Sequence, residues 1–286
     1  MAKRVVIPAA GLGTRLLSAT KEQPKEMLPI FTRTATGQLR LKPLLQLVFE
    51  KLYDTGFREF CFIVGRGKRV VEDHFTPDDA FVDYLKSRNI LEFAHELGEF
   101  YDKVRSSALI FANQHGPRGF GDAVYNARLF TGGEPFLVHA GDDLIISKNN
   151  SHLGRLANAY DEYDADAALL VEKVEDPTKY GVIAGKRVDP GIYRVDKIME
   201  KPPIPPSNLA SVAVYIFGPS IYQAIERTQP DRNGEVQLTD AIQQLIDQQC
   251  RVYAVELSKG EKRIDIGTPE SYWTGLDATY SSMQRR

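Results

Sequence analysis

Residues 5–29 read VVIPAAGLGTRLLSATKEQPKEMLP, and this stretch is the strongest indication of fold in the chain. Its apolar run Val5–Ile7 predicts a buried strand, and small residues with the glycines Gly11 and Gly13 follow directly. Backbone N–H groups that no side chain covers can hold phosphate oxygens at such a turn. Arg15 and Lys25 add a planar guanidinium and a compact ammonium for the same phosphates. The stretch therefore predicts a cradle for a nucleoside triphosphate.

The better-known glycine motifs fit this stretch badly. A dinucleotide fingerprint needs a third glycine where this chain has Leu16. A Walker loop needs its lysine directly after the last glycine, but Lys25 lies far beyond Gly13. A nicotinamide-dependent oxidoreductase needs an acidic ribose-binding residue about 20 residues after the glycines. The chain reads Thr32-Arg33-Thr34-Ala35 there. A plain strand-to-helix turn explains the glycines alone but not the two cations.

Short β-rich runs alternate with longer amphipathic stretches along the chain. Strands are expected at Val5–Ile7, Phe60–Val64, Ala108–Phe111, Phe136–His139 and Ala167–Val171, and helices at Pro43–Thr55, Gly121–Phe130 and Leu153–Tyr163. This alternation predicts an α/β fold, with a Rossmann-like, mostly parallel mixed sheet flanked by helices and ligands at the carboxyl ends of the strands. We expect a single domain over residues 1–286.

Three further segments have their own signatures. The polar insert Phe31–Leu41 is expected to form a surface loop or hairpin. The charged and aromatic stretch Asp78–Lys103 predicts helix, and we expect it to act as a lid or an oligomer contact. The prolines of Pro202–Pro206 favour a stiff, extended segment that directs Glu200 and Lys201.

Bulk composition is that of an ordinary globular protein. The chain has 286 residues, 43% hydrophobic and 26% charged, with a net charge of -2. That charge gives no reason to expect binding to nucleic acid or to an anionic membrane. No signal peptide is evident, and no apolar run approaches the ~18 residues that span a bilayer. The two cysteines, Cys61 and Cys250, are expected to be reduced and buried, which favours a cytoplasmic location.

The opening stretch as a whole resembles the G-x-G-T-R-…-P-K signature of sugar-nucleotide pyrophosphorylases. KEMLP at residues 25–29 is especially similar to bacterial-type UTP–glucose-1-phosphate uridylyltransferases, and the resemblance continues to about Leu276. It implies a nucleotidyltransferase that uses UTP, glucose 1-phosphate and Mg²⁺, and that assembles as a homodimer or homotetramer. It assigns catalytic roles to Arg15, Lys25 and Lys201. It assigns nucleotide contacts to the cradle residues Ala9, Ala10, Gly11, Gly13 and Thr14.

A second constellation, Asn113–Ala123, follows an expected strand and begins an expected helix. Gln114 offers an amide donor and an acceptor that match a uracil edge, and Gly119 allows close approach of the backbone. The segment resembles the family's Q-x-…-G-x-G-x-A, which reads the pyrimidine through these two residues. A glycine-rich loop with Asp122 as a helix cap is the plain alternative.

Two aspartates, far apart in sequence, are the expected metal ligands. Asp142 follows the strand Phe136–His139, and a carboxylate there suits Mg²⁺. The family's L-G-D and D-x-G-[TN]-P motifs place the metal on Asp142 and Asp265. Asp143 is expected to be solvated or to lie behind the ligand. A structural turn at Asp142 and a helix cap near Asp265 are the alternatives, although Thr268 before Pro269 fits the cap better.

The resemblance implies a nucleotide-binding part at roughly 1–145 and a sugar-binding part at roughly 146–286. It places the sugar contacts at Gly181, Glu200 and Lys201. In the family, the counterpart of Glu200 accepts hydrogen bonds from sugar hydroxyls, that of Lys201 contacts the sugar phosphate, and that of Gly181 touches the sugar through its backbone. Residues 234–242, GEVQLTDAI, also resemble the family. We expect this segment to begin a helix, with Thr239 as a candidate cap, and to shape the wall of the sugar pocket.

Several readings stay open at this stage. Leu41 stands where the family commonly has an aspartate. His115 and Pro117-Arg118 alter the segment Asn113–Ala123, which is expected to read the base and is called the base loop below. Nucleotide and sugar preferences are therefore not fixed. A dTTP-using thymidylyltransferase and a uridylyltransferase for N-acetylglucosamine 1-phosphate are the alternatives within the enzyme class. Outside it, a non-catalytic nucleotide-sugar sensor remains.

Overall fold

The computed structural model describes residues 2–34 and 36–284, and nine of the strands it contains form one continuous sheet. Their bounds are β1 (Arg4–Pro8), β4 (Glu59–Gly65), β5 (Ala108–Gln114), β6 (Phe136–His139), β8 (Ala167–Lys173), β9 (Gly181–Asp189), β10 (Ile192–Glu200), β11 (Leu209–Phe217) and β12 (Val252–Glu256). They lie in the order β5-β4-β1-β6-β11-β8-β12-β10-β9. The five strands expected from the sequence fall within β1, β4, β5, β6 and β8, which confirms them.

The sheet changes character along its width. β1 pairs in parallel with both β4 and β6, and β4 pairs in parallel with β5. β11 then runs antiparallel to β6 and β8, and β10 runs antiparallel to β12 and β9. β8 and β12 are again parallel. The predicted mixed α/β sheet is confirmed, but it is not mostly parallel: three parallel pairings are grouped around β1 and β4 and one joins β8 to β12, while the other neighbouring strands pair antiparallel because hairpins and long connections bring β9, β10 and β11 back in the opposite direction.

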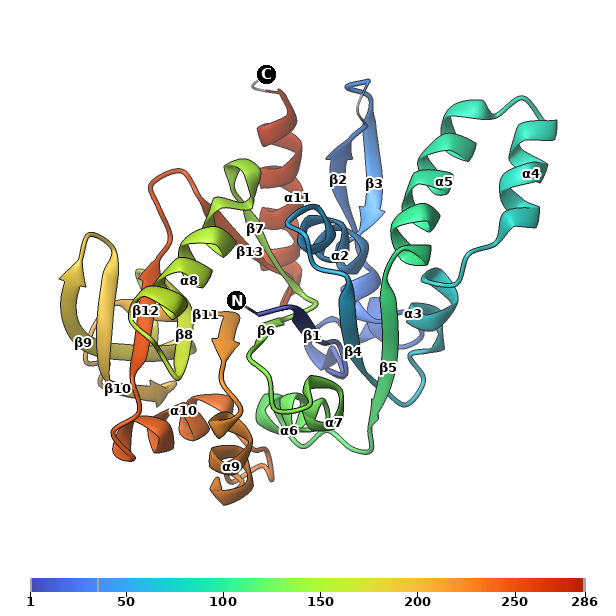
Figure 1. The fold of residues 1–286 in the computed structure, drawn as a ribbon. Coiled ribbons are helices and arrows are strands. Elements are labelled where there is room, and N and C mark those ends of the chain that lie inside the picture. Colours follow the sequence, from blue (N-terminus) through green and yellow to red (C-terminus); the bar gives the residue numbers. More distant parts are fainter. Residues whose placement is uncertain (1, 35, 285–286) are drawn as a thin grey trace.

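Helices cover both faces of this sheet (Figure 1). They are α1 (Leu17–Thr20), α2 (Leu44–Asp54), α3 (Arg69–His74), α4 (Asp79–Ser87), α5 (Leu91–Arg105), α6 (Phe120–Tyr125), α7 (Arg128–Thr131), α8 (Ser151–Glu162), α9 (Ser220–Arg227), α10 (Leu238–Asp247) and α11 (Pro269–Gln284). Alternate residues of β1 serve two hydrophobic clusters: Val5 and Ile7 pack in the one beneath α2 and α8, and Val6 packs in the one beneath α6, α9 and α10.

One expected helix is interrupted. The stretch Gly121–Phe130 forms two short helices, α6 and α7, because the backbone tightens between them. The backbone N–H of Ala127 bonds to the carbonyl of Val124, three residues back, and the side chain of Asn126 competes for the carbonyl of Asp122 at 2.7 Å. The expected helices Pro43–Thr55 and Leu153–Tyr163 are confirmed as α2 and α8.

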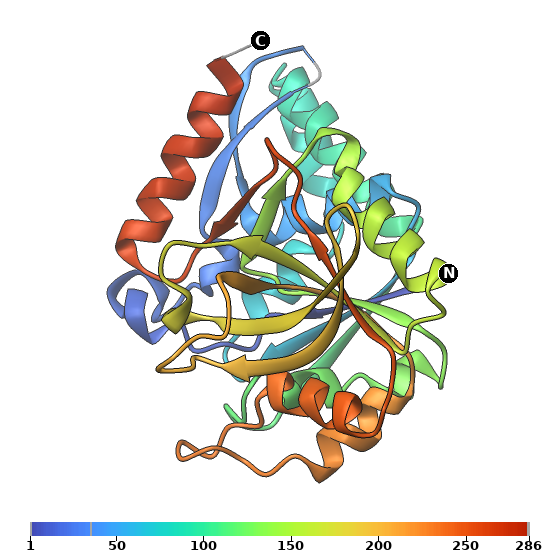
Figure 2. The same cartoon turned by 90° about the vertical axis from the view of Figure 1, so that its left-hand side faces the viewer.

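The polar insert Phe31–Leu41 forms a hairpin, which is one of the two forms expected from the sequence. β2 (Pro29–Arg33) and β3 (Leu39–Pro43) pair antiparallel and stand beside α11 in both views (Figures 1 and 2). Tyr272 of α11 donates its hydroxyl to the carbonyl of Pro29 at 2.8 Å, and Phe31 meets the ring of Tyr280 edge-on. The stretch Asp78–Lys103 is helical, as expected, and forms α4 and most of α5.

Within residues 2–34 and 36–284, no helix combines the length and apolar character needed to cross a membrane. Both cysteines are free. Cys61 is buried in β4, as expected, whereas Cys250 is only partly buried because it lies in the turn between α10 and β12.

Candidate active site

A cleft of about 490 Å³ opens at the carboxyl ends of β1 and β5, close to the end of β6. Eight of the residues expected from the sequence line it: Ala10, Gly11, Gly13, Thr14, Lys25, Gln114, Gly119 and Asp142. This position follows the rule for ligands in open α/β sheets. Arg15, Asp265 and the three sugar-side residues lie outside its walls, as does Ala9.

The glycine loop leaves β1 directly and presents backbone to the cleft. Gly13 has φ +64°, a left-handed conformation that glycine adopts without strain, and its carbonyl accepts a bond from the hydroxyl of Thr20 at 2.9 Å. Gly65 at the end of β4 lies under the loop, since a Cβ there would come within 3.1 Å of the carbonyl of Ala10. Ala9 differs from its neighbours: it is buried, and its N–H already donates to the carbonyl of Ile63 at 2.8 Å.

Lys25 and Arg15 lie beside the glycine loop and differ in burial and in charge pairing. Lys25 is largely buried and makes an ion pair with Asp142. Burial alone would lower the pKa of Lys25, but the carboxylates of Asp142, Glu26 and Asp265 together raise it above its usual value. Arg15 is exposed, and within the described residues it makes no hydrogen bond or ion pair. It lies close to the loop after β13, because a Cβ on Gly267 would come within 3.0 Å of its guanidinium.

A separate two-stranded sheet brings the expected metal ligands together. β7 (Asp143–Ile146) pairs antiparallel with β13 (Lys262–Asp265), which sets Asp265 opposite Asp143. The N–H of Ile266 then donates to the carbonyl of Asp142 at 3.2 Å. Burial and the nearby carboxylates of Asp143 and Asp142 raise the pKa of Asp265 to about 6, despite the opposing charge of Arg263.

Asp143 is not solvated, contrary to one of the two expectations. It is 2% exposed and accepts bonds from the Nε of Arg263 at 3.0 and 3.1 Å. Arg263 also reaches Glu172 and lies 5.4 Å from the ring centre of Tyr180. The side chain of Asp143 therefore supports β13 from behind, while Asp142, the preceding residue, faces Lys25.

The two remaining aspartates fit a magnesium ion. No cluster of three acidic, histidine or cysteine side chains suited to a metal occurs among residues 2–34 and 36–284. Mg²⁺ does not need one, since it is usually bound by one or two carboxylates with water and substrate phosphates. Asp142 and Asp265 supply that number, and the Lys25 ammonium now sits against Asp142 where a cation is favoured.

The base loop uses Gln114 differently from the expectation. Its Nε2 donates to the carbonyl of Gly119 at 3.1 Å and to Asp122 at 2.8 Å, so both amide hydrogens have partners. Gln114 therefore presents its oxygen alone as an acceptor. Asp122 is not the cap of α6, which has Gly119 at that position and no side-chain capping bond.

The sugar-side residues lie together on neighbouring strands. Gly181 in β9 is paired with Glu200 in β10, and a Cβ on Gly181 would meet Thr239 at 2.7 Å and Glu200 at 3.3 Å. Glu200 accepts a bond from the hydroxyl of Thr239 at 3.1 Å and pairs with Lys201 at 2.9 Å. Lys201 has φ +39°, which is unusual for a residue with a side chain.

Sequence reasoning missed part of the cleft wall. Asn233 and Glu26, for which no role was expected, line this cleft, and so does Glu235, which was expected in the wall of the sugar pocket. The segment holding Glu235 packs on the base loop, because the N–H of Gly121 donates to the carbonyl of Val236 at 2.9 Å. The sequence signal for this contact was the pair Gly119 and Gly121. A Cβ on Gly119 would lie 2.7 Å from the carbonyl of Val236, so another chain segment packs directly against the loop.

Thr239 is not a helix cap, because α10 begins at Leu238 after Gln237 and has no side-chain capping bond. Its hydroxyl is bonded to Glu200 instead. Thr268 does cap α11, where its hydroxyl accepts a bond from the N–H of Ser271 at 3.2 Å.

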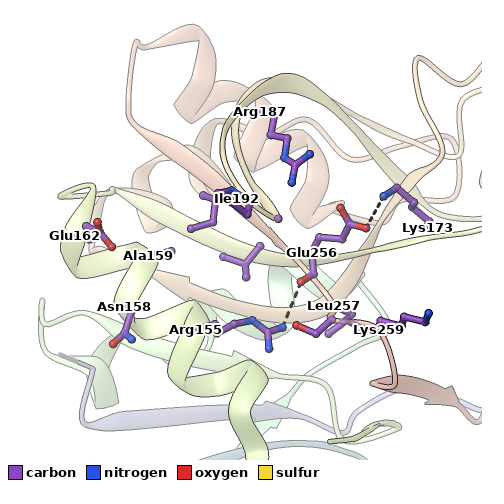
Figure 3. Close-up of a pocket in the computed structure, with 14 residues that line it drawn as sticks. Arg155, Asn158, Ala159, Glu162, Lys173, Arg187, Ile192, Glu256, Leu257 and Lys259 are labelled. Carbon is purple, nitrogen blue, oxygen red and sulfur yellow. Dashed lines mark hydrogen bonds and ion pairs between the residues drawn. The ribbon is translucent and has the colours of Figure 1, made fainter.

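A second hollow, of about 540 Å³, lies between α8 and the β9–β10 hairpin (Figure 3). Its cations are largely occupied: Arg155 bonds to Glu261 at 2.7 Å, and Lys173 bonds to Glu256. It contains none of the expected site residues. The charge pairing and the missing motifs leave the cleft after β1 as the candidate active site.

Comparisons with known proteins point the same way as the geometry. A family model described as "Nucleotidyl transferase" matches residues 4–282. The UTP–glucose-1-phosphate uridylyltransferase of Streptococcus pyogenes is 41% identical over 273 residues, which cover 93% of this chain and 84% of that protein.

Solved structures agree with this match. A crystal structure of apo UDP-glucose pyrophosphorylase aligns with a TM-score of 0.88 and 32% identity, covering 99% of each chain. A second, of UDP-glucose pyrophosphorylase complexed with UDP-glucose, aligns with a TM-score of 0.82 and 32% identity over 100% of each chain.

Proposed function

This chain belongs to the nucleotidyl transferase family, and on that premise we propose that it transfers the uridylyl group of UTP to glucose 1-phosphate. The products are UDP-glucose and pyrophosphate. The named relatives support this pair of substrates. The cleft supports the reaction, because one cavity joins a phosphate-binding loop, Lys25 and Asp142 with the acceptor oxygen of Gln114 at its base-reading end.

In the proposed reaction, an oxygen of the sugar phosphate attacks the α-phosphorus of UTP. A new P–O bond forms as the bond from the α-phosphorus to the bridging oxygen breaks, and pyrophosphate carries away the electron pair. The attacking oxygen is already ionised, so no general base is required. Catalysis is then mainly positioning and electrostatic stabilisation.

The chain supplies cations for each end of this displacement. Lys25 faces the loop and is charged, and turning from Asp142 toward the phosphates would let it stabilise the departing pyrophosphate. Arg15 is exposed beside the same loop and is free to join it. Lys201 projects from the end of β10 and would orient the sugar phosphate.

Asp142 and Asp265 are the residues that would hold Mg²⁺. The ion, when bound, would offset the mutual repulsion of the two substrates' phosphates. The β7–β13 pairing holds the backbone of Asp265, and the bond from the N–H of Ile266 holds the backbone carbonyl of Asp142, so the two residues are brought together by main-chain contacts.

Recognition is divided between the two parts of the chain. The oxygen of Gln114 would accept the N3–H of uracil, and the loop at Gly119 would approach the base. Glu200 would accept bonds from sugar hydroxyls beside Gly181. We place the nucleotide in the part formed by residues 1–145 and the sugar in residues 146–286, with Asn233 and Glu235 reaching back to the nucleotide.

The test is an activity matrix. Pyrophosphate release is measured for UTP, dTTP, ATP and GTP, each against glucose 1-phosphate, galactose 1-phosphate and N-acetylglucosamine 1-phosphate. We expect the highest kcat/KM with UTP and glucose 1-phosphate. A maximum with dTTP, or with another sugar, would replace that substrate assignment. No release with any pair would favour a non-catalytic sensor.

We also propose that the enzyme is a cytoplasmic homodimer or homotetramer. Free cysteines suit a reducing compartment. Large apolar side chains are exposed on α4 and α5, among them Phe81, Tyr84, Leu91 and Phe93, which supports their use as a contact between copies. Light scattering on the purified protein measures the mass, and a monomer at micromolar concentration would reject the assembly.

A further inference from the structure

One part of the opening motif has no role in the proposed reaction: Glu26, the residue after Lys25. It is 1% exposed, and its carboxylate accepts a bond from Lys68 at 2.8 Å. Lys68 is also buried, at 8% exposure. Two charges have therefore been removed from water within one residue of the proposed catalytic lysine.

Stability alone does not explain this pair. Removing a carboxylate and an ammonium from water costs several kcal/mol per ion, and their mutual attraction repays it only with good geometry. Apolar residues of similar volume often do as well or better. The neighbouring positions Met27 and Leu28 show that apolar side chains are accommodated in this segment, since both are buried. A buried ion pair here calls for a second reason.

The geometry supplies that reason. A Cβ placed on Gly11 would lie 3.5 Å from the Cε of Lys25 and 3.8 Å from the Oε1 of Glu26. Both side chains therefore lie against the same point of the phosphate loop. The Oε2 of Glu26 is taken by Lys68, and Glu26 lines the cleft.

Lys68 fixes this carboxylate from a different element. It follows β4 and precedes α3, and its backbone N–H bonds to the carbonyl of Gly65 at 3.2 Å. β4 is an interior strand of the main sheet, paired with both β1 and β5, so the position of Glu26 is tied to that sheet. The 3₁₀ turn Lys25–Met27, which carries Lys25, is otherwise a short connection between α1 and β2.

Lys25 has two anionic neighbours with different partners, since Asp142 pairs with Lys25 itself and Glu26 pairs with Lys68. Asp142 bonds to it directly, and that bond must open before Lys25 can reach a phosphate. Glu26 does not bond to Lys25, but after Asp142 it is the carboxylate that most raises the pKa of Lys25. Because Lys68 holds it, Glu26 remains in place when the Asp142 bond opens.

We propose that Glu26, fixed by Lys68, is a positioning residue that keeps the Lys25 ammonium in the cleft during the reaction. The inference rests on the proposed function. It adds a fixed counter-charge beneath the phosphate loop and assigns a role to a lysine in the β4–α3 connection.

The first test is Glu26→Gln, which keeps the shape and still accepts a bond from Lys68 while removing the charge beside Lys25. We expect the melting temperature to stay within a few degrees and kcat for pyrophosphate release to fall about 10-fold or more, with the KM for UTP within about threefold. Wild-type kcat in this variant would overturn the proposal. Absence of activity in the wild-type protein would instead overturn the proposed function.

The second test separates positioning from a structural role. Lys68→Met leaves Glu26 buried without its partner, so we expect both stability and kcat to fall. The double variant Glu26→Leu/Lys68→Met removes both charges, and we expect stability to recover while kcat stays about 10-fold low. Recovery of kcat together with stability would show a purely structural pair and overturn the proposal.

A matched control uses the pair Arg155–Glu261, which also joins a largely buried carboxylate to a cation but lies at the second hollow. In Arg155→Met and Arg155→Met/Glu261→Leu, stability is expected to change while kcat stays within twofold. A 10-fold loss of kcat in these variants would show that any broken ion pair lowers activity, and would overturn the specific role of Glu26.

Discussion

The nucleotide side and the sugar side of the site are built from different materials. Gly11, Gly13 and Gly119 give the nucleotide side a wall of backbone. The sugar side is made of side chains that already bond to one another, with Glu200 held by both Thr239 and Lys201. Backbone amides survive most substitutions, whereas a side-chain network does not. On the proposed assignment, the difference predicts that triphosphate binding tolerates most substitutions and that sugar recognition is the easier property to change.

The largest effect is expected at the ion pair between Lys25 and Asp142 in the cleft. Lys25→Ala and Asp142→Ala remove the charges at the cleft centre, and we expect each to lower kcat by about 100-fold or more, the scale of losing a key electrostatic contact. Steady-state pyrophosphate release measures it, with the exposed Lys259→Ala as a control that keeps wild-type kcat. Near-normal rates in both variants would contradict the assignment of the cleft.

A crowding experiment tests the sugar side alone. In Gly181→Ala, the new methyl would lie 2.7 Å from Thr239 Cγ2 and close to Glu200, so we expect the KM for glucose 1-phosphate to rise about 10-fold, or ~1.4 kcal/mol. The KM for UTP should not change. Thr239→Ser keeps the hydroxyl that bonds Glu200 and removes the clashing methyl. The double variant should therefore regain much of the affinity, and a double variant as weak as the single one would show that the clash lies elsewhere.

A smaller effect is expected at the base. Gln114→Ala removes one acceptor for the pyrimidine, and a lost hydrogen bond of about 1 kcal/mol predicts a five- to tenfold rise in the KM for UTP. The KM for glucose 1-phosphate should stay constant, in contrast to Gly181→Ala. Gln244→Ala is the matched control, because its amide bonds to Thr228 away from the cleft. Equal loss for both substrates would mean that the two sides are coupled.

A fall in pH should lower the unfolding free energy of the whole domain. Burial lowers the pKa of His74 to about 4 and of His152 to about 3, from an ordinary value of 6.5. The unfolded chain therefore binds more protons, so this stability is fully present above pH 6.5 and is lost as pH falls toward the folded values. We expect each histidine to account for about 1–2 kcal/mol of lost unfolding free energy between pH 7 and pH 5.

His74 lies in α3, in the proposed nucleotide part, and His152 lies in α8, in the proposed sugar part, but one sheet runs through both. Urea unfolding followed by circular dichroism should thus show one transition at each pH, with a shallower pH slope in His152→Gln. Two separate transitions would show that the parts unfold independently.

Local patterns were enough to predict the strands around β1 and the order of the motifs, because buried parallel strands are short apolar runs and their ends carry the site. They could not decide whether Asp143 is solvated or lies behind Asp142. Both follow β6, and their opposite roles come from the pairing of β7 with β13, more than a hundred residues further along. The same limit applies to Asn233 and Glu235, which reach the cleft only because Val236 bonds to the base loop.

Thr239 shows a different limit. Its position before an amphipathic run is typical of a helix cap, but its hydroxyl bonds to Glu200 on another strand. Thr239 bonds to a distant side chain instead of to the first turn of its own helix, and no pattern within residues 234–242 predicts that partner.

The contact between α11 and the β2–β3 hairpin also bears on the order in which the site is completed during synthesis. Tyr272 bonds to the carbonyl of Pro29 across 243 positions of sequence, and Asp265 lies just before the same helix. At about 5–20 residues per second, a ribosome makes these residues roughly 12–50 s after the phosphate loop. A nascent chain therefore contains the residues of the proposed triphosphate cradle well before it contains Asp265. During that interval the proposed active site lacks its second carboxylate, and we expect it not to turn over UTP.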